Sequence, residues 1–187
     1  MLMTNTLILL LKEDNKLEKR EFKEKSKGQF RDVIKYADGT VETTEWTNNV
    51  IVNDINKAIA YALAQKGGAT YWAIGQGLDT WDNDNPPSPS ATDTSLVSEI
   101  GRKAISGSNI KFLTSEGVES SSPTNIIQIT LTFNSSDCNG NWREFAIVGG
   151  DATSDINTGI LINHKTHKLI SKDSTMEIER QMRFTFN

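Results

Sequence analysis

Two histidines are the first side chains whose type and spacing could do chemistry. His164 and His167 lie three residues apart and are flanked by Lys165 and Lys168. A metal site would need further ligands that converge on the same point. In a strand, a spacing of three directs the two side chains to opposite faces. The pattern therefore favours two surface histidines over a metal site.

Other catalytic patterns are incomplete in this sequence. The serines are numerous, but no Gly-x-Ser-x-Gly elbow positions one of them as a nucleophile. The segment Gly75-Gln76-Gly77 lacks the third glycine of a dinucleotide-binding loop and does not open a helix, so it favours a tight exit from a strand. Cys138 is the only cysteine, which excludes an internal disulfide and a cysteine-rich zinc site. We expect no catalytic residues, no cofactor and no enzymatic activity.

An acidic, proline-rich segment over residues 78–94 is predicted to be a long loop, and such loops are usually functional or mobile. The carboxylates of Asp79, Asp82 and Asp84 could hold Ca²⁺, but their spacing is not that of an EF-hand loop and favours a solvated loop. Trp81 lies among them. It either packs on its own domain, stacks on a sugar, or anchors a neighbouring subunit. These four residues are predicted interaction residues.

Length and charge narrow the function further. A chain of 187 residues fits one domain, and a net charge of −4 gives no electrostatic footprint for direct binding of nucleic acid. The five apolar residues 7–11 are too few for a membrane span and lack the basic flank of a signal peptide, so they predict a buried strand. Residues 12–27 interleave seven basic with five acidic residues, which favours a solvated hairpin or short exposed helix over an interaction arm.

The elements that must position these residues are mostly strands. Two β-rich runs, 30–36 and 41–46, flank Asp38-Gly39, the dipeptide favoured at the two positive-φ positions of a type I′ turn, and predict a hairpin. One helix is predicted over residues 53–65, where apolar residues recur with helical spacing. The second half predicts strands at 95–105, 110–113, 125–133, 142–148, 159–164 and 175–186.

The last predicted strand, 175–186, carries apolar residues at every second position except for Arg180. Only Asn187 follows it, so we expect it to be an edge strand available for pairing with another subunit. Phe184 and Phe186 are its candidate interaction residues. The N-terminal arm is the other candidate for such pairing.

Taken together, the pattern predicts a mainly β fold: an antiparallel β-sandwich, jelly-roll-like or immunoglobulin-like, with one packed α-helix and an N-terminal hairpin or arm. Residues 1–28 would form the N-terminal strand and charged arm. Residues 29–187 would form a single sandwich domain that contains the helix 53–65.

The order of several short motifs resembles a family of small bacteriophage and prophage structural proteins of the tail, collar and baseplate. The motifs cover about residues 46–187. The charged arm has no counterpart in them, and the acidic insertion around residues 81–85 is longer than in that family's pattern. In chain order they are the Asn-rich turn at 46–53, Tyr71-Trp72-Ala73-Ile74-Gly75-Gln76-Gly77, the loop closing on Leu96, Glu99-Ile100-Gly101-Arg102, the strand 127–133, Asn139-Gly140-Asn141-Trp142-Arg143-Glu144, the segment 159–162 and Phe184-Thr185-Phe186.

This resemblance implies a non-enzymatic virion protein, made in the host bacterial cytoplasm, that acts in several copies. Its partners would be copies of itself and other virion proteins of the portal, tail, collar or fibre. An alternative function from another class is a carbohydrate-binding module or adhesin, in which Trp81 and the loop from Asp79 to Asp84 contact a host glycan, with Ca²⁺ as its one conceivable cofactor.

Overall fold

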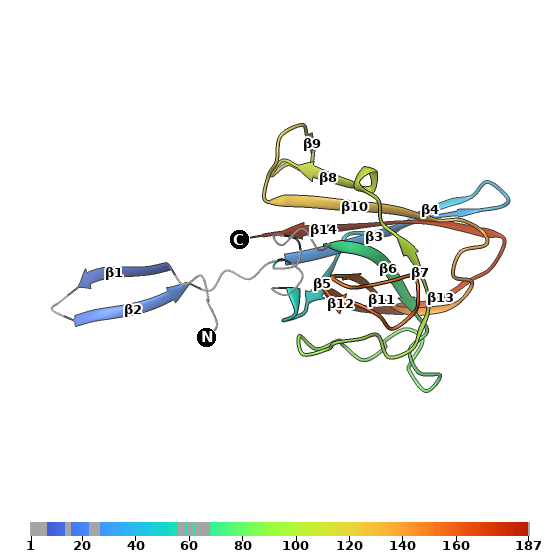
Figure 1. The fold of residues 1–187 in the computed structure, drawn as a ribbon, viewed down its shortest axis with the longest axis horizontal. Coiled ribbons are helices and arrows are strands. Elements are labelled where there is room, and N and C mark those ends of the chain that lie inside the picture. Colours follow the sequence, from blue (N-terminus) through green and yellow to red (C-terminus); the bar gives the residue numbers. More distant parts are fainter. Residues whose placement is uncertain are drawn as a thin grey trace.

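The computed structural model describes residues 7–13, 16–22, 27–55, 59, 62 and 68–186, and the side chains among them from residue 27 onward. The chain is built almost entirely of antiparallel strands (Figure 1). The strands of the first half are β1 (Leu7–Glu13), β2 (Lys16–Phe22), β3 (Lys27–Tyr36), β4 (Val41–Thr43), β5 (Thr47–Ile51) and β6 (Ala69–Gly75). Those of the second half are β7 (Glu99–Ala104), β8 (Ile110–Leu113), β9 (Glu119–Ser120), β10 (Ile126–Phe133), β11 (Gly140–Gly149), β12 (Ile160–Leu161), β13 (Asn163–Lys172) and β14 (Met176–Thr185), with a 3-10 turn, η1 (Gly107–Asn109), before β8.

The described strands form two sheets of very different size. β1 and β2 pair as a hairpin of their own, so residues 7–11 form a strand as predicted, and the charged segment supplies its partner β2 instead of a hairpin by itself. The predicted burial of residues 7–11 lies outside the described side chains. The remaining twelve strands form one sheet in the order β7-β6-β11-β13-β5-β3-β14-β10-β8-β9, with β12 on β11 and β4 on β3. The mainly β, antiparallel class is confirmed. The hydrogen bonding joins these strands into one sheet through the short strand β5, and so it does not describe the two separate sheets of a sandwich.

The sheet folds over an aromatic core, because strands of its two halves pack against one another. Phe30 of β3 packs edge-on against Phe145 of β11, with ring centroids 4.9 Å apart. Phe133 of β10 contacts both Trp72 and Trp142, with centroids at 6.4 and 5.1 Å. All five rings are almost fully buried. The alternation of apolar residues predicts correctly which side of β10 and of β14 faces the core.

One charged pair lies inside this core. Arg180 of β14 stands directly opposite Asp32 of β3, and its Nε and Nη2 donate to the two carboxylate oxygens over 2.6 and 2.8 Å. The guanidinium also lies 4.4 Å from the Phe145 ring centroid. Next to it, burial and the charge of Arg180 lower the pKa of His167 to about 4. His167 is therefore neutral at pH 7, with Nδ1 donating to the Lys168 carbonyl.

The expectation that the last strand is a free edge is wrong. β14 pairs with β3 along its whole length on one side and with β10 on the other. Phe184 is accordingly 2% exposed in the core, and Phe186 is half-buried and stacked on it with ring centroids 6.2 Å apart. Being last in the chain did not make the strand last in the sheet, because β3 and β10 both supply apolar partners for it.

Three further expectations meet the structure differently. The helix at 53–65 falls largely outside the described residues. The Asn-rich turn after Trp46 is instead the strand β5, which pairs with β3 and β13. Residues 165–172 form most of β13, although no strand was predicted there. The prediction missed this segment because several buried residues of β13 are polar and break the apolar alternation. None of the described helices is long and apolar enough to cross a membrane.

The hairpin between β3 and β4 is confirmed, but its turn is not type I′. The Gly39 amide donates to the Tyr36 carbonyl, and among the turn residues only Gly39 has a positive φ, of 88°. Ala37 and Asp38 thus take the central positions of a type I turn, and Gly39 forms the left-handed residue that follows it. The Asp38 carboxylate accepts the Thr40 amide over 2.9 Å, which fixes this arrangement.

We expect Gly39→Ala to lower the free energy of unfolding by about 1 kcal/mol, because an alanine at a left-handed φ is strained even where space is open. Gly107→Ala is the matched control, since it also has open space around it but no positive φ. Urea unfolding measures both. Equal stabilities for the two variants would contradict the assigned turn.

Candidate functional site

The most distinctive surface feature is the loop of residues 76–98, hereafter loop 76–98, which joins β6 to β7 and lies along the lower side of the molecule in Figure 1. Its two ends are closed by a hydrogen bond from the Gln76 amide to the Ser98 carbonyl, over 2.8 Å. Between them the chain contains no strand or helix. A loop of this length keeps one shape only if other parts of the protein hold it.

Glu144 of β11 holds both ends of the loop. Its carboxylate is fully buried. Oε1 accepts the amides of Gly77 and Ser98 over 3.2 and 2.8 Å, and Oε2 accepts the amide of Val97 over 3.0 Å. Gly75 makes room for it, since a Cβ there would lie 2.6 Å from Oε1. One ionised side chain thus satisfies three loop amides that would otherwise be buried without partners.

His164 of β13 extends this contact to the middle of the loop. Its Nε2 lies 2.9 Å from Glu144 Oε2, and its Nδ1 lies 2.7 Å from Oδ2 of Asp93 in the loop. Burial lowers the pKa of His164, but the hydrogen bonds and charges of Glu144 and Asp93 outweigh it, so the pKa lies above its usual value. Burial raises the pKa of Glu144, but its hydrogen bonds from His164 and the loop amides bring it below its usual value. The three side chains form a carboxylate–imidazolium–carboxylate chain.

Arg143 holds the acidic tip of the loop. Its guanidinium donates to Asn83 Oδ1 over 3.0 Å and to the Gln76 carbonyl over 3.1 Å. The Asp79 carboxylate lies 3.8 Å from it and is otherwise exposed. The backbone of the tip is also tied to β13, because the Leu169 amide donates to the Asn83 carbonyl over 2.8 Å.

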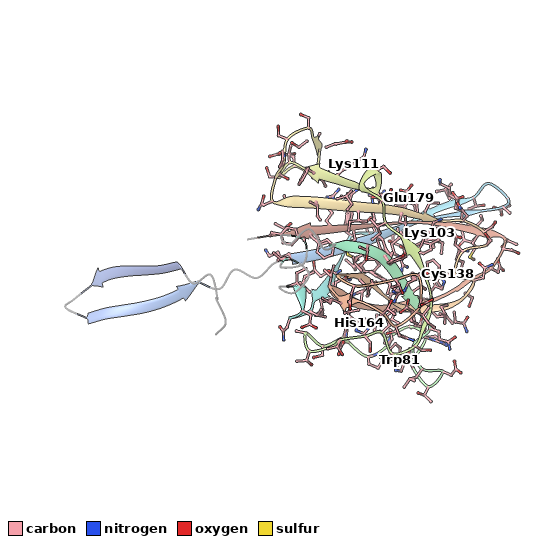
Figure 2. All side chains as sticks on the ribbon, in the orientation of Figure 1. Trp81, Lys103, Lys111, Cys138, His164 and Glu179 are labelled. Atoms are coloured by element: carbon pink, nitrogen blue, oxygen red, sulfur yellow. The ribbon has the colours of Figure 1, made fainter. Side chains whose placement is uncertain are left out.

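Two further side chains of β13 complete the attachment. Thr166 donates to the Pro87 carbonyl over 2.7 Å, and Lys168 pairs with Asp84 over 2.7 Å. We call the five strand residues that hold loop 76–98 the polar clamp: Arg143, Glu144, His164, Thr166 and Lys168. Figure 2 shows His164 in the body of the domain and Trp81 at the outer end of the loop.

The predicted loop residues have distinct environments. Trp81 is half-buried and covers Gly77, where a Cβ would collide with the indole ring, so it packs on its own domain. The Asp82 carboxylate accepts the amides of Asp84 and Asn85, over 2.8 and 2.9 Å, and shapes the tip. The Asp79 side chain is 94% exposed. In the part of the chain that the structure describes, no three His, Cys, Asp or Glu side chains are arranged to hold a metal ion.

The histidines were wrongly expected at the surface. His164 is 3% exposed, and His167 lies against the core rings of Phe30 and Phe145. Sequence reasoning also missed Arg143 and Glu144, which are as buried as the apolar residues around them. The available signal was charge at strand positions that the apolar alternation assigns to the inside. Its meaning depends on partners that lie dozens of residues away in the chain.

The polar clamp gives a testable dependence on pH. A raised pKa of His164 stabilises the folded protein below the unfolded value of 6.5, and this contribution is lost as the pH rises through the folded pKa. A lowered pKa of Glu144 stabilises it above 4.5, and this contribution is lost as the pH falls through the folded pKa. We expect the thermal midpoint of the protein to be highest between about pH 4.5 and about pH 6.5, where both contributions are present. In His164→Gln the thermal midpoint should no longer fall as the pH rises on the alkaline side. If it falls as in the unaltered protein, His164 is not the group responsible.

Residues 50–130 match the model of a protein family described as baseplate wedge 3 tail fiber network component. The match is somewhat less than half of the chain, and it includes all of loop 76–98 but neither β11 nor β13. No curated protein and no solved structure matches the chain. The family match supports the resemblance drawn from the motifs: residues 50–130 are similar to a phage tail- and baseplate-associated structural protein family.

Proposed function

We propose that this chain is a non-enzymatic structural protein of the bacteriophage particle, which joins parts of the tail or baseplate, or supports a fibre, through contacts between copies of itself and with other virion proteins. The observation that carries the proposal is the family match over residues 50–130. The proposed contact surface is loop 76–98, because the matched segment includes it and the polar clamp holds it in one shape. A preorganised loop loses little conformational entropy when a partner binds.

The described side chains that could act as nucleophiles agree with a non-enzymatic role. Burial and the nearby charge of Asp137 raise the pKa of the Cys138 thiol to about 11, so hardly any reactive thiolate forms at pH 7. His164 is held between two carboxylates and His167 is neutral against the core rings, and no serine hydroxyl of the described residues hydrogen-bonds to either ring. These residues have structural partners instead of catalytic ones.

Labelling of particles tests the proposal directly. An antibody raised against the chain should bind purified virions, and gold-labelled antibody should mark the tail or its baseplate in electron micrographs. Mass spectrometry of the same particles should recover peptides of the chain. Absence from particles that carry their full set of tail proteins would overturn the proposed function.

A further inference from the structure

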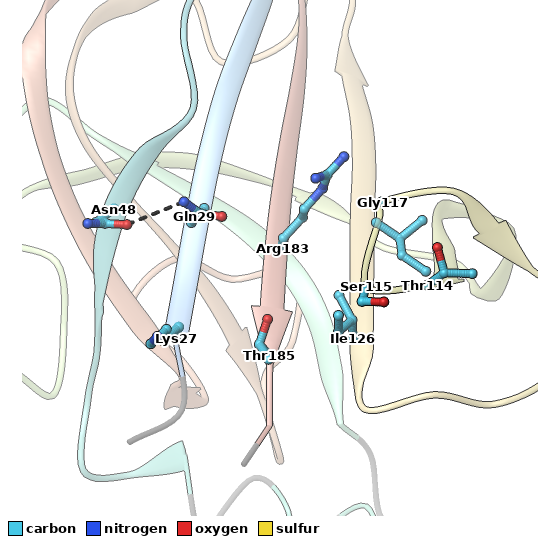
Figure 3. A pocket seen from close by; sticks show the side chains of 10 residues that line it. Lys27, Gln29, Asn48, Thr114, Ser115, Gly117, Ile126, Arg183 and Thr185 are labelled. Carbon is cyan, nitrogen blue, oxygen red and sulfur yellow. Dashed lines mark hydrogen bonds between the residues drawn. The ribbon is translucent and has the colours of Figure 1, made fainter. Parts of the chain in front are cut away.

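A polar pocket of about 430 Å³ opens on the outer face of the large sheet (Figure 3). Lys27, the first residue of β3, and Arg183, near the end of β14, line the pocket, and Thr185 and Asn48 lie beside them. The turn between β8 and β9, with Gly117, forms the opposite wall. Among the described residues that line the pocket, Lys27 and Arg183 are charged and none carries a carboxylate.

Arg183 is fixed in place, and no described carboxylate pairs with it. Its Nε donates to Gln128 Oε1 over 2.8 Å, and its guanidinium lies 4.2 Å from the ring centroid of Trp46. Arg31 lies over the same indole at 5.0 Å. Burial and the charge of Arg31 lower the pKa of Arg183, as expected for a cation that has neighbours of its own sign. Among the described residues neither Lys27 nor Arg183 forms an ion pair, so an added carboxylate would relieve an uncompensated positive field.

The same chain carries exposed carboxylates on a different side. The side chain of Asp79 is 94% exposed. The Asp82 carboxylate accepts two backbone hydrogen bonds, which lower its pKa and keep it ionised. In Figures 1 and 2 loop 76–98 lies at the lower end of the molecule, and β8 and β9 lie at the upper end. The loop therefore cannot reach the pocket of its own chain. The pocket of a second copy is open to it.

We propose that this pocket receives the carboxylates of Asp79 and Asp82 from a second copy of the chain, so that copies join head to tail. Such a contact uses two different surfaces of each copy, and it therefore builds a closed ring or an open filament instead of a symmetric dimer. This inference rests on the proposed function and specifies the contact between copies. The polar clamp contributes by holding the two carboxylates in a fixed position.

Charge reversal with rescue tests the contact. Lys27→Glu and Asp79→Lys change two exposed side chains, and the ion pair of Asp79 with Arg143 is a long one, at 3.8 Å. Sedimentation velocity should show association of the unaltered protein that strengthens as salt falls from about 0.5 M to about 0.05 M, because screening weakens. Each single variant should associate about tenfold more weakly. The double variant, with both charges reversed, should regain most of the affinity.

Lys35→Glu and Asp151→Lys are the matched controls, because they reverse exposed charges outside the pocket and outside the loop. They should leave association unchanged. A protein that stays monomeric at low salt, single variants that associate like the unaltered protein, or a double variant without rescue would each overturn the inference. None of these results bears on whether antibody labels the virion, so the contact and the proposed function can fail separately.

Discussion

Replacing Glu144 with Gln should lower the free energy of unfolding by about 3 kcal/mol, because it leaves a buried site that was built for a charge. The carboxylate accepts three loop amides and contacts His164. An amide of the same shape has one acceptor oxygen, so its NH₂ group must face either a loop N–H or the imidazolium. The substitution therefore weakens the hydrogen bonds to the loop amides and also removes the negative charge that compensates His164.

The effect should be concentrated in loop 76–98. Chymotrypsin cleaves after Trp81 only when the loop opens, so cleavage of the native variant should be faster there than at aromatic residues of the core. Glu177→Gln is the control, since Glu177 pairs with Lys35 at 3.5 Å on the surface and its loss should cost less than about 0.5 kcal/mol. If Glu144→Gln matched this control in both stability and cleavage, the polar clamp would not be what holds the loop.

The second large effect concerns the buried pair of Asp32 and Arg180. Asp32→Val alone should destabilise the protein by about 3–5 kcal/mol, because it leaves a guanidinium uncompensated among aromatic rings. Arg180→Met alone should cost a similar amount by stranding the carboxylate. The double variant should lie within about 1 kcal/mol of the unaltered protein, since two apolar side chains remove the desolvation cost of both charges.

Urea unfolding of the four proteins forms a double-mutant cycle that isolates the coupling between the two residues. The pair has side chains 3% and 0% exposed, so solvent screening does not reduce the expected coupling. Additive losses in the double variant would contradict it. They would mean that Asp32 and Arg180 contribute through separate contacts, such as the stacking of Arg180 on Phe145.

The local pattern of the sequence determined most strands and much of the core. Period-two alternation over residues 127–133 and 176–184 correctly indicates the buried faces of β10 and β14, because a strand exposes and buries successive side chains whatever its neighbours are. The Asp-Gly pair at 38–39 marks the hairpin for a similarly local reason. Its exact turn type was missed because the position of Gly39 relative to the ladder depends on pairing between β3 and β4.

The pattern failed where the inside of the protein is polar. The predicted strand ended at His164, so most of β13 was missed. The buried residues of β13 include Asn163, His164, Thr166 and Lys172, and polar residues in this pattern are typical of a surface segment. Two of them, His164 and Thr166, attach loop 76–98. Sequence reasoning identified the loop and its acidic tip correctly, but it had no means of pairing Glu144 with loop amides 46 and 47 residues away.

The sequence by itself determined a β-rich chain with one long acidic loop, and its motifs pointed to phage tail and baseplate proteins, because composition, period and motif order are properties of the chain read in one dimension. Tertiary structure alone decided that β14 lies inside the sheet, that His164 is buried and that Glu144 fixes the loop. Those outcomes depend on which distant segments meet, and the free energy of a buried charge is set by its partners in space.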